Sequence, residues 1–162
     1  KLLPVDGAAT DYFGSSVAIG GTTAVVGAHT DNDNGDDSGS AYLFDTATGQ
    51  QTAKLLPADG AASDLFGRSA TISGTTAVVG AAFDDDNGDD SGAVYLFHIT
   101  TGQQIAKLLP GDGAAGDQFG WSLSISGTTA VVGASFDNDN GNDSGAAYVF
   151  SVDSGGDELP DD

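Results

Sequence analysis

The sequence contains no cysteine and no methionine, and only four of its 162 residues are lysine or arginine. Without cysteine the chain has no disulfide framework and no thiolate chemistry. With 24 acidic residues and a formal net charge of −20, the chain has too few cationic side chains to bind nucleic acid or an acidic membrane surface. No apolar run approaches the about 20 residues that a membrane-spanning helix needs. Cations are therefore the small partners that this composition favours.

The remaining composition is that of a folded protein rich in turns. Hydrophobic residues make up 39% of the chain, and glycine occurs 25 times against four prolines, which is unlike a disordered acidic tail. The length predicts one domain with a core of its own. Because the chain opens on Lys1 and shows no signal-peptide pattern, we expect a mature product or a fragment of a longer protein.

One unit is written three times. The phrase KLLP begins at positions 1, 54 and 107, which gives a period of 53 residues. It opens KLLPxDGAAxDxFGxS, which is followed by IxGTTAVVGA, by the acidic stretch DxDNGxDSG and by YxF. Periods of about 40–50 residues are typical of propeller blades. The predicted units are 1–53, 54–106 and 107–150, followed by an acidic tail or linker at 151–162.

Each unit has the pattern of short antiparallel strands. Residues 13–19 and 119–125 alternate between large apolar and smaller side chains, and TAVVGA after the GG or SG turn is apolar on both faces. AYLF, VYLF or AYVF follows the acidic stretch, and QQTAKLLP or QQIAKLLP gives a fourth run. Four antiparallel strands make one propeller blade. We therefore predict an all-β fold of three four-stranded β-propeller blades.

The third unit breaks this pattern at its end. After Phe150 the sequence reads SVDSGGDELPDD and lacks a QQxAKLLP strand, whereas the chain opens with a KLLP that no strands precede. An orphan strand at one end could complete the incomplete blade at the other, within one chain or between chains, and would leave fewer open sheet edges. Truncation from a longer array explains the same pattern, and both interpretations stay open.

Two dipeptides in each unit resemble a known repeat. Phe-Gly occurs at 13–14, 66–67 and 119–120, and Gly-Ala occurs at 27–28, 80–81 and 133–134. Because both pairs recur at the same places in all three units, they resemble FG-GAP repeats over nearly all of residues 1–150. The chain departs from that motif at His29, Ala82 and Ser135, which stand where the motif often has proline. The resemblance implies blades like those of the propeller head of integrin α chains and of bacterial surface proteins. It also implies an extracellular or cell-surface location.

Three blades do not close an ordinary propeller ring, since rings take about four or more blades. The resemblance therefore implies either an incomplete ring that belongs to a longer chain or an assembly of several chains. A head-to-tail contact that does not close would give a fibre. We expect self-association or the remaining blades of a longer chain, and a protein or polysaccharide is a further candidate ligand.

The acidic stretch, at 31–39, 84–92 and 137–145, is a candidate calcium site. Calcium takes about six to eight oxygen ligands, mostly carboxylates and carbonyls, and a glycine lets the loop turn around it. The candidates in each stretch are three carboxylates and an amide. The predicted Ca²⁺ ligands are Asp31, Asp33, Asn34, Asp37, Asp84, Asp86, Asn87, Asp90, Asp137, Asp139, Asn140 and Asp143.

Two observations oppose a calcium site. The spacing is not that of an EF-hand, because Gly35 stands where D-x-[DN]-x-[DN]-G requires the third ligand. In calcium-binding FG-GAP blades the ligands precede the VVGA-like strand, and that place here is the turn GGTT or SGTT. The alternative is a solvated connection with Asx turns. A second acidic set could cap a turn or add cation ligands: Asp6 and Asp11, with their equivalents Asp59, Asp64, Asp112 and Asp117.

No catalytic constellation recurs. His29 and His98 have no histidine at the equivalent positions of the other units. The pattern therefore places no base beside the serines that recur at 16, 69 and 122. Trp121 likewise does not recur, because Ser15 and Arg68 occupy the equivalent positions of the other units. We therefore predict a noncatalytic extracellular Ca²⁺-binding propeller module for adhesion, binding or assembly. The alternatives are a self-assembling surface fibre subunit built by strand pairing between chains, and a propeller-type hydrolase or its accessory domain.

Overall fold

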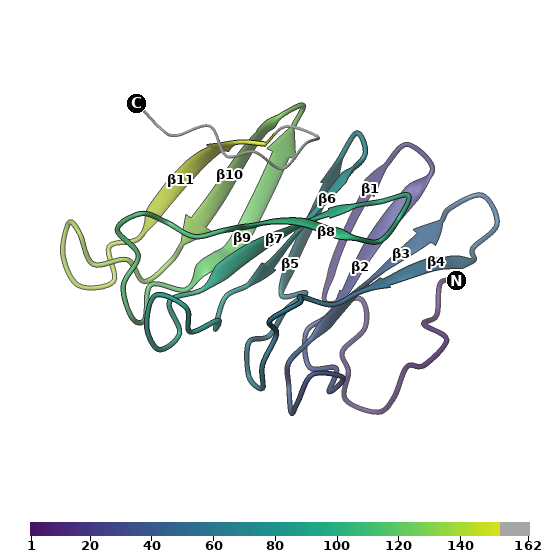
Figure 1. Ribbon diagram of the computed structural model, residues 1–162, viewed down its shortest axis with the longest axis horizontal. Helices are drawn as coiled ribbons and strands as arrows, with labels where there is room; N and C mark the ends of the chain where they lie inside the picture. Colours follow the sequence, from purple (N-terminus) through teal and green to yellow (C-terminus); the bar gives the residue numbers. More distant parts are fainter. Residues whose placement is uncertain (153–162) are drawn as a thin grey trace.

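A computed structural model describes residues 1–152, which fold into three antiparallel sheets set side by side (Figure 1). We name them blades 1, 2 and 3 in chain order. Blade 1 comprises, in sheet order, β1 (Ser16–Gly20), β2 (Thr23–Ala28), β3 (Ser40–Asp45) and β4 (Gln51–Leu55). Blade 2 comprises β5 (Ser69–Ser73), β6 (Thr76–Ala81), β7 (Ala93–His98) and β8 (Gln104–Leu108). Blade 3 comprises β9 (Phe119–Ser126), β10 (Thr129–Ala134) and β11 (Ala146–Ser151).

The predicted all-β class and the blade architecture are confirmed. Within residues 1–152 blade 3 has three strands, in accord with the broken end of its repeat, and the array is an incomplete ring. Of the tail predicted at 151–162, the part from residue 153 onward lies outside the described residues. In the part of the chain that the structure describes, no helix has the length and apolar character to cross a membrane.

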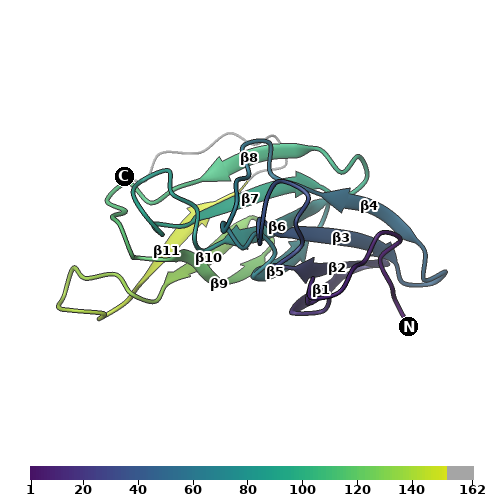
Figure 2. The same ribbon diagram turned by 90° about the horizontal axis from the view of Figure 1, so that it is seen from below.

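Turn chemistry sets the strand ends. β1 and β2 are joined by a tight turn in which Gly21 has a φ of 57°, a conformation that glycine adopts without steric penalty. The acidic stretch connects the second strand of each blade to the third, as predicted. Figure 2 shows the result: the first strands β1, β5 and β9 line one side of the array, and the last strands β4 and β8 line the other.

Each blade has two apolar faces, and neighbouring blades pack face to face. The face of blade 1 toward blade 2, which we call a back face, presents Val25 and Leu43. The face of blade 2 toward blade 1, a front face, presents Ile72, Val79 and Tyr95. These side chains form one buried cluster, and the back face of blade 2 meets the front face of blade 3 in a second one. Burial of one large apolar side chain stabilises the fold by about 1.5–3 kcal/mol, so these clusters hold the blades together.

The glycines of the two motif pairs allow adjacent blades to touch through their backbones. Ser16 donates a hydrogen bond from Oγ to the carbonyl oxygen of Gly67 at 2.8 Å, and Ser69 donates to that of Gly120 at 2.6 Å. A Cβ added to Gly80 would overlap the Gly120 carbonyl oxygen. The glycine of Gly-Ala therefore leaves room for the Phe-Gly turn of the next blade.

Candidate functional site

The acidic stretch docks each blade on the next one through backbone hydrogen bonds. The carbonyl oxygen of Asp36 accepts a hydrogen bond from the amide of Ser63 at 2.8 Å, and that of Ser38 accepts one from Phe66 at 3.0 Å. Equivalent bonds join the stretch of blade 2 to the turn that opens blade 3. The stretch is therefore a connector between blades, whatever its side chains bind.

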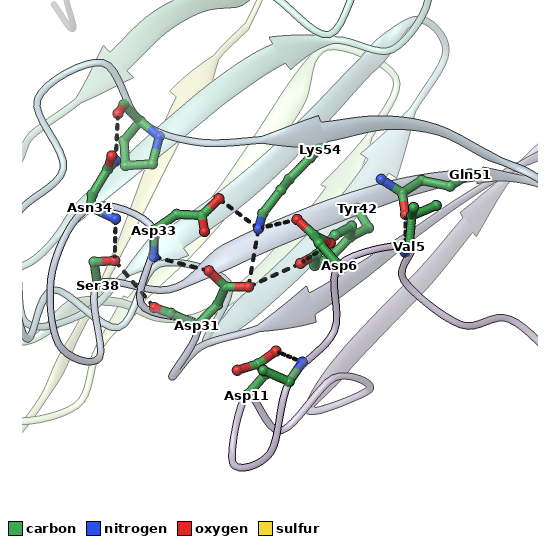
Figure 3. A network of polar contacts seen from close by, with 12 residues as sticks. Val5, Asp6, Asp11, Asp31, Asp33, Asn34, Ser38, Tyr42, Gln51 and Lys54 are labelled. Carbon is green, nitrogen blue, oxygen red and sulfur yellow. Dashed lines mark hydrogen bonds and ion pairs between the residues drawn. The ribbon is translucent and has the colours of Figure 1, made fainter.

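A lysine ammonium occupies the centre of the acidic cluster in blade 1 (Figure 3). Lys54 Nζ lies 2.8 Å from Asp6, 3.1 Å from Asp31 and 2.7 Å from Asp33. The Tyr42 hydroxyl lies 3.0 Å from an Asp31 oxygen and 3.1 Å from an Asp6 oxygen. The amide of Asp33 donates to the other Asp31 oxygen at 3.1 Å. The cation on which these carboxylates converge is the chain's own lysine.

Blade 2 repeats this arrangement. Lys107 Nζ lies 2.9 Å from Asp59, 3.0 Å from Asp84 and 2.6 Å from Asp86. The Tyr95 hydroxyl lies 2.7 Å from Asp84 and 2.9 Å from Asp59. Because the two clusters have the same geometry, the lysine is a regular part of the blade.

The carboxylates keep both lysines charged. Burial lowers the pKa of Lys54, but its hydrogen bonds to Asp33 and Asp6 outweigh burial and raise that pKa above its usual value. The pKa of Lys107 is raised for the same reasons. Burial raises the pKa of Tyr42 to about 12, so its hydroxyl stays a donor. Each cluster therefore holds one fixed positive charge at any physiological pH.

In blade 3 the equivalent tyrosine and aspartate pair without a lysine. The Tyr148 hydroxyl donates to the buried Asp137 at 2.9 Å, and the amide of Asp139 donates to Asp137 at 3.0 Å. Burial, followed by hydrogen bonds to Asp137 and Asp112, raises the pKa of Tyr148. In the other blades the lysine comes from the fourth strand, which the described part of blade 3 lacks. Within residues 1–152 the third cluster, which we define as Asp112, Asp137 and Asp139, therefore has no lysine equivalent to Lys54 or Lys107.

The other predicted calcium ligands lie apart from these clusters. Asn34 donates from its amide to the carbonyl oxygen of Pro57 at 3.4 Å, on the segment that leaves the blade. Asn87 makes the equivalent bond, and Asn140 is exposed. Three aspartates have left-handed φ values of 52–56° and donate their amides to a side chain of their own loop: Asp37, Asp90 and Asp143. Among residues 1–152 no three acidic or histidine side chains are grouped to hold a metal ion, and calcium binding stays a prediction.

The blade geometry agrees with comparisons with known proteins. The family model of the FG-GAP repeat matches residues 1–44, 50–97 and 103–150. The chain belongs to the FG-GAP repeat family. No curated protein matches it. Among solved structures, the computationally designed Ika4 protein is similar over 100% of this chain and 78% of its own, with a TM-score of 0.60 and 19% identity. At that identity the likeness concerns the fold alone.

The repeated acidic stretch indicated the aspartates but not the lysine and tyrosine that bind them. A signal was present in the sequence. All three lysines of the chain stand in KLLP, at the same period as the aspartates, and the tyrosine of YxF recurs with them. The second acidic set divides: Asp6 joins the lysine cluster, whereas Asp11 accepts the amide of Ala8 at 2.6 Å and caps a turn, as predicted.

We expect the stability of this FG-GAP fold to fall as the pH rises through the titration of Asp64. Burial raises the pKa of this carboxyl from 3.8 to about 6, although it accepts a hydrogen bond from the Ala61 amide at 2.6 Å. Between these two values the folded protein binds a proton that the unfolded chain has lost, so the free energy of unfolding decreases with rising pH. Urea unfolding at pH 4, 5 and 6 measures the slope.

The matched variant for that measurement is Asp64→Asn, which keeps the turn but removes the titration. Its free energy of unfolding should be less dependent on pH in this interval than that of the wild type. Asp36→Asn, at an exposed carboxylate, is the control and should retain the wild-type slope. If the free energy of unfolding of Asp64→Asn kept the wild-type dependence on pH, the titration would belong to another group.

Proposed function

We propose that this chain is a noncatalytic extracellular module that uses its FG-GAP blades for binding or assembly and takes up Ca²⁺ at an acidic loop. The observation that carries the proposal is how the recurring polar groups are used. Loop carbonyls join blade to blade, and lysines join carboxylates within a blade, so the repeated chemistry is architectural. FG-GAP repeats are typical of extracellular or surface proteins, which supports the location.

The contacts of the two histidines support a noncatalytic role. The His29 ring stacks on Tyr12 at a centroid distance of 5.8 Å, and burial lowers its pKa. His98 accepts a hydrogen bond at Nδ1 from the amide of Thr100 at 3.3 Å, within a turn. In both places the imidazole serves local structure, and neither contact involves a recurring serine.

The third acidic cluster is where we expect Ca²⁺. In blades 1 and 2 the ion would have to displace a lysine that three carboxylates hold. In blade 3, Asp112, Asp137 and Asp139 offer oxygens without that competitor and would have to draw together around the ion. Extracellular calcium modules bind with dissociation constants of about 0.1–1 mM, and we expect that range here.

Calorimetric titration of Ca²⁺ into chelator-treated protein tests this site. We expect one ion per chain and at least about a tenfold loss of affinity in Asp139→Asn, because one of the few charged ligands is removed. The equivalent Asp86→Asn, at a carboxylate already paired with Lys107, is the control and should bind like the wild type. Absence of heat at millimolar Ca²⁺, or equal binding by both variants, would contradict the proposal.

A fibre subunit is the second candidate function. It is favoured by the apolar side chains that stay exposed on the first and last blades, Val17 and Ile19 at one end and Val131 and Val149 at the other. An array whose two ends are unlike and apolar is suited to repeated head-to-tail contact.

A further inference from the structure

The two ends of the array carry the two halves of an interface that the chain already uses twice internally. We propose that a second copy of this chain docks the front face of its blade 1 on the back face of blade 3, with Lys1 of the second copy entering the cluster of Asp112, Asp137 and Asp139. The inference deepens the assembly role proposed above and requires no calcium, since Ca²⁺ in the monomer and Lys1 in the assembly would occupy the same cluster in turn. The contact is head-to-tail both in a closed ring and in an open fibre.

The apolar side chains exposed at the two ends of the array are equivalent, residue by residue, to side chains that are buried between its blades. Inside the array Val25 and Leu43 of a back face are 0% exposed because a front face covers them. Their equivalents in blade 3, Val131 and Val149, are 42% and 55% exposed. On the front face of blade 1, Ile19 is 67% exposed. Docking a second copy would bury these side chains against one another, as the chain does between its own blades.

A hollow marks the place where the backbone of the second copy would enter. It measures about 330 Å³ and is lined by Ser122, Leu123, Ser124, Val131, Gly133 and Ala147. In blade 1 the equivalent place, beside Gly27, is filled by the carbonyl group of Gly67, which accepts the hydrogen bond of Ser16. At Gly133 an added Cβ would meet only atoms of Ser122, the nearest at 2.6 Å. Gly14 of the second copy is the equivalent of Gly67 and fits this hollow.

Charge complementarity selects the same partner. Within residues 1–152 no lysine forms an ion pair with the third cluster. Lys54 and Lys107 are already engaged, whereas Lys1 forms no ion pair within residues 1–152. Lys1 opens the same KLLP phrase that supplies the lysine of blades 1 and 2. A second copy therefore brings the missing charge in the sequence context in which the chain uses it elsewhere.

At the left-handed positions of both halves the backbone already has the φ values found in the docked interface. In the segment that docks on blade 1, Ser63 and Leu65 have φ values of 73° and 52°. Their equivalents Thr10 and Tyr12 have values of 75° and 50°. The accepting loop matches as well, with Asp143 at 52° against 56° for its equivalent in blade 1. Such preorganisation lowers the conformational entropy lost on association.

Two end-blocked variants of the full chain test this contact. Ile19→Asp blocks the front face and Val149→Asp blocks the back face, both at exposed positions, so that folding is preserved. Sedimentation in chelator and high salt, which screens repulsion between chains of net charge −20, gives their masses. We expect the wild type to exceed its 16.0 kDa monomer mass as concentration rises. Each variant alone should stay monomeric, and an equimolar mixture should form one-to-one dimers only.

A control and a charge variant complete the design. Val5→Asp also changes an exposed valine, but the equivalents Ala58 and Gly111 stay exposed inside the array, so this variant should assemble like the wild type. Lys1→Gln should weaken association by about tenfold or more, as removal of one partner of a desolvated charge pair does. A monomeric wild type, or variants that remain monomeric when mixed, would overturn the proposal. Unchanged association of Lys1→Gln would overturn the part assigned to the lysine. Because calcium is chelated throughout, failure here is distinct from failure of the calcium titration.

Discussion

Replacing Lys107 by methionine is expected to lower the free energy of unfolding by about 3 kcal/mol. The side chains of Lys107 and Asp84 are only 15% and 5% exposed, so the substitution leaves a buried carboxylate without its cation. Methionine keeps an apolar stem of similar length, which restricts the change to the charge. We take the lower part of the usual range because Asp59 and Asp86 are about half exposed. Urea unfolding at neutral pH measures the loss.

Lys1→Met is the control for that experiment. The same chemical change is made at a lysine that is exposed in the monomer, and in dilute protein its effect should stay within about 0.5 kcal/mol. Equal losses in the two variants would mean that the buried cluster contributes no more than a surface charge.

Replacing Gly80 by alanine is expected to destabilise the fold by at least about 2–3 kcal/mol. The new Cβ would overlap the Gly120 carbonyl oxygen, which belongs to the backbone and cannot rotate away. Blades 2 and 3 would have to separate at the point where Ser69 donates its interblade hydrogen bond. Thermal and urea unfolding both measure this loss.

Gly133→Ala is the matched control, at the equivalent position of blade 3. Its Cβ meets only Ser122, whose hydroxyl can turn aside, so the monomer should lose much less stability than Gly80→Ala does. The same methyl group would fill the hollow that receives a second copy, and we expect weaker association from it. Comparable destabilisation by both alanines would show that interblade contact is not what makes Gly80 necessary.

The blade architecture could be predicted because it is written in local patterns with a fixed period. TAVVGA is apolar on both faces in the second unit because β6 lies inside its sheet with a neighbouring blade on each side. The turn glycines and the missing QQxAKLLP run of the third unit were equally visible. These features depend on side-chain type at successive positions, which periodicity reports directly.

The centre of the acidic cluster could not be predicted in the same way. Lys54 reaches Asp31 only because β3 and β4 pair in the register that sets Tyr42 opposite Lys54. Register is a relation between strands, and a single sequence does not display it. The docking of Asp36 and Ser38 on the next blade was hidden for another reason, because backbone carbonyls are the same in every residue.

The lysine that completes one blade belongs, in the sequence, to the phrase that opens the next repeat. The sequence repeat and the folded blade are thus out of phase. During synthesis, which releases the N-terminal part first, Asp31 and Asp33 are exposed to water before Lys54 has been made. Blade 1 becomes complete only when the second unit begins to emerge, and blade 2 only when the third does. Order would therefore spread along the nascent chain from each blade to its successor, as in other linear arrays of repeats, and a unit excised at the KLLP boundaries would lack the charge that stabilises it.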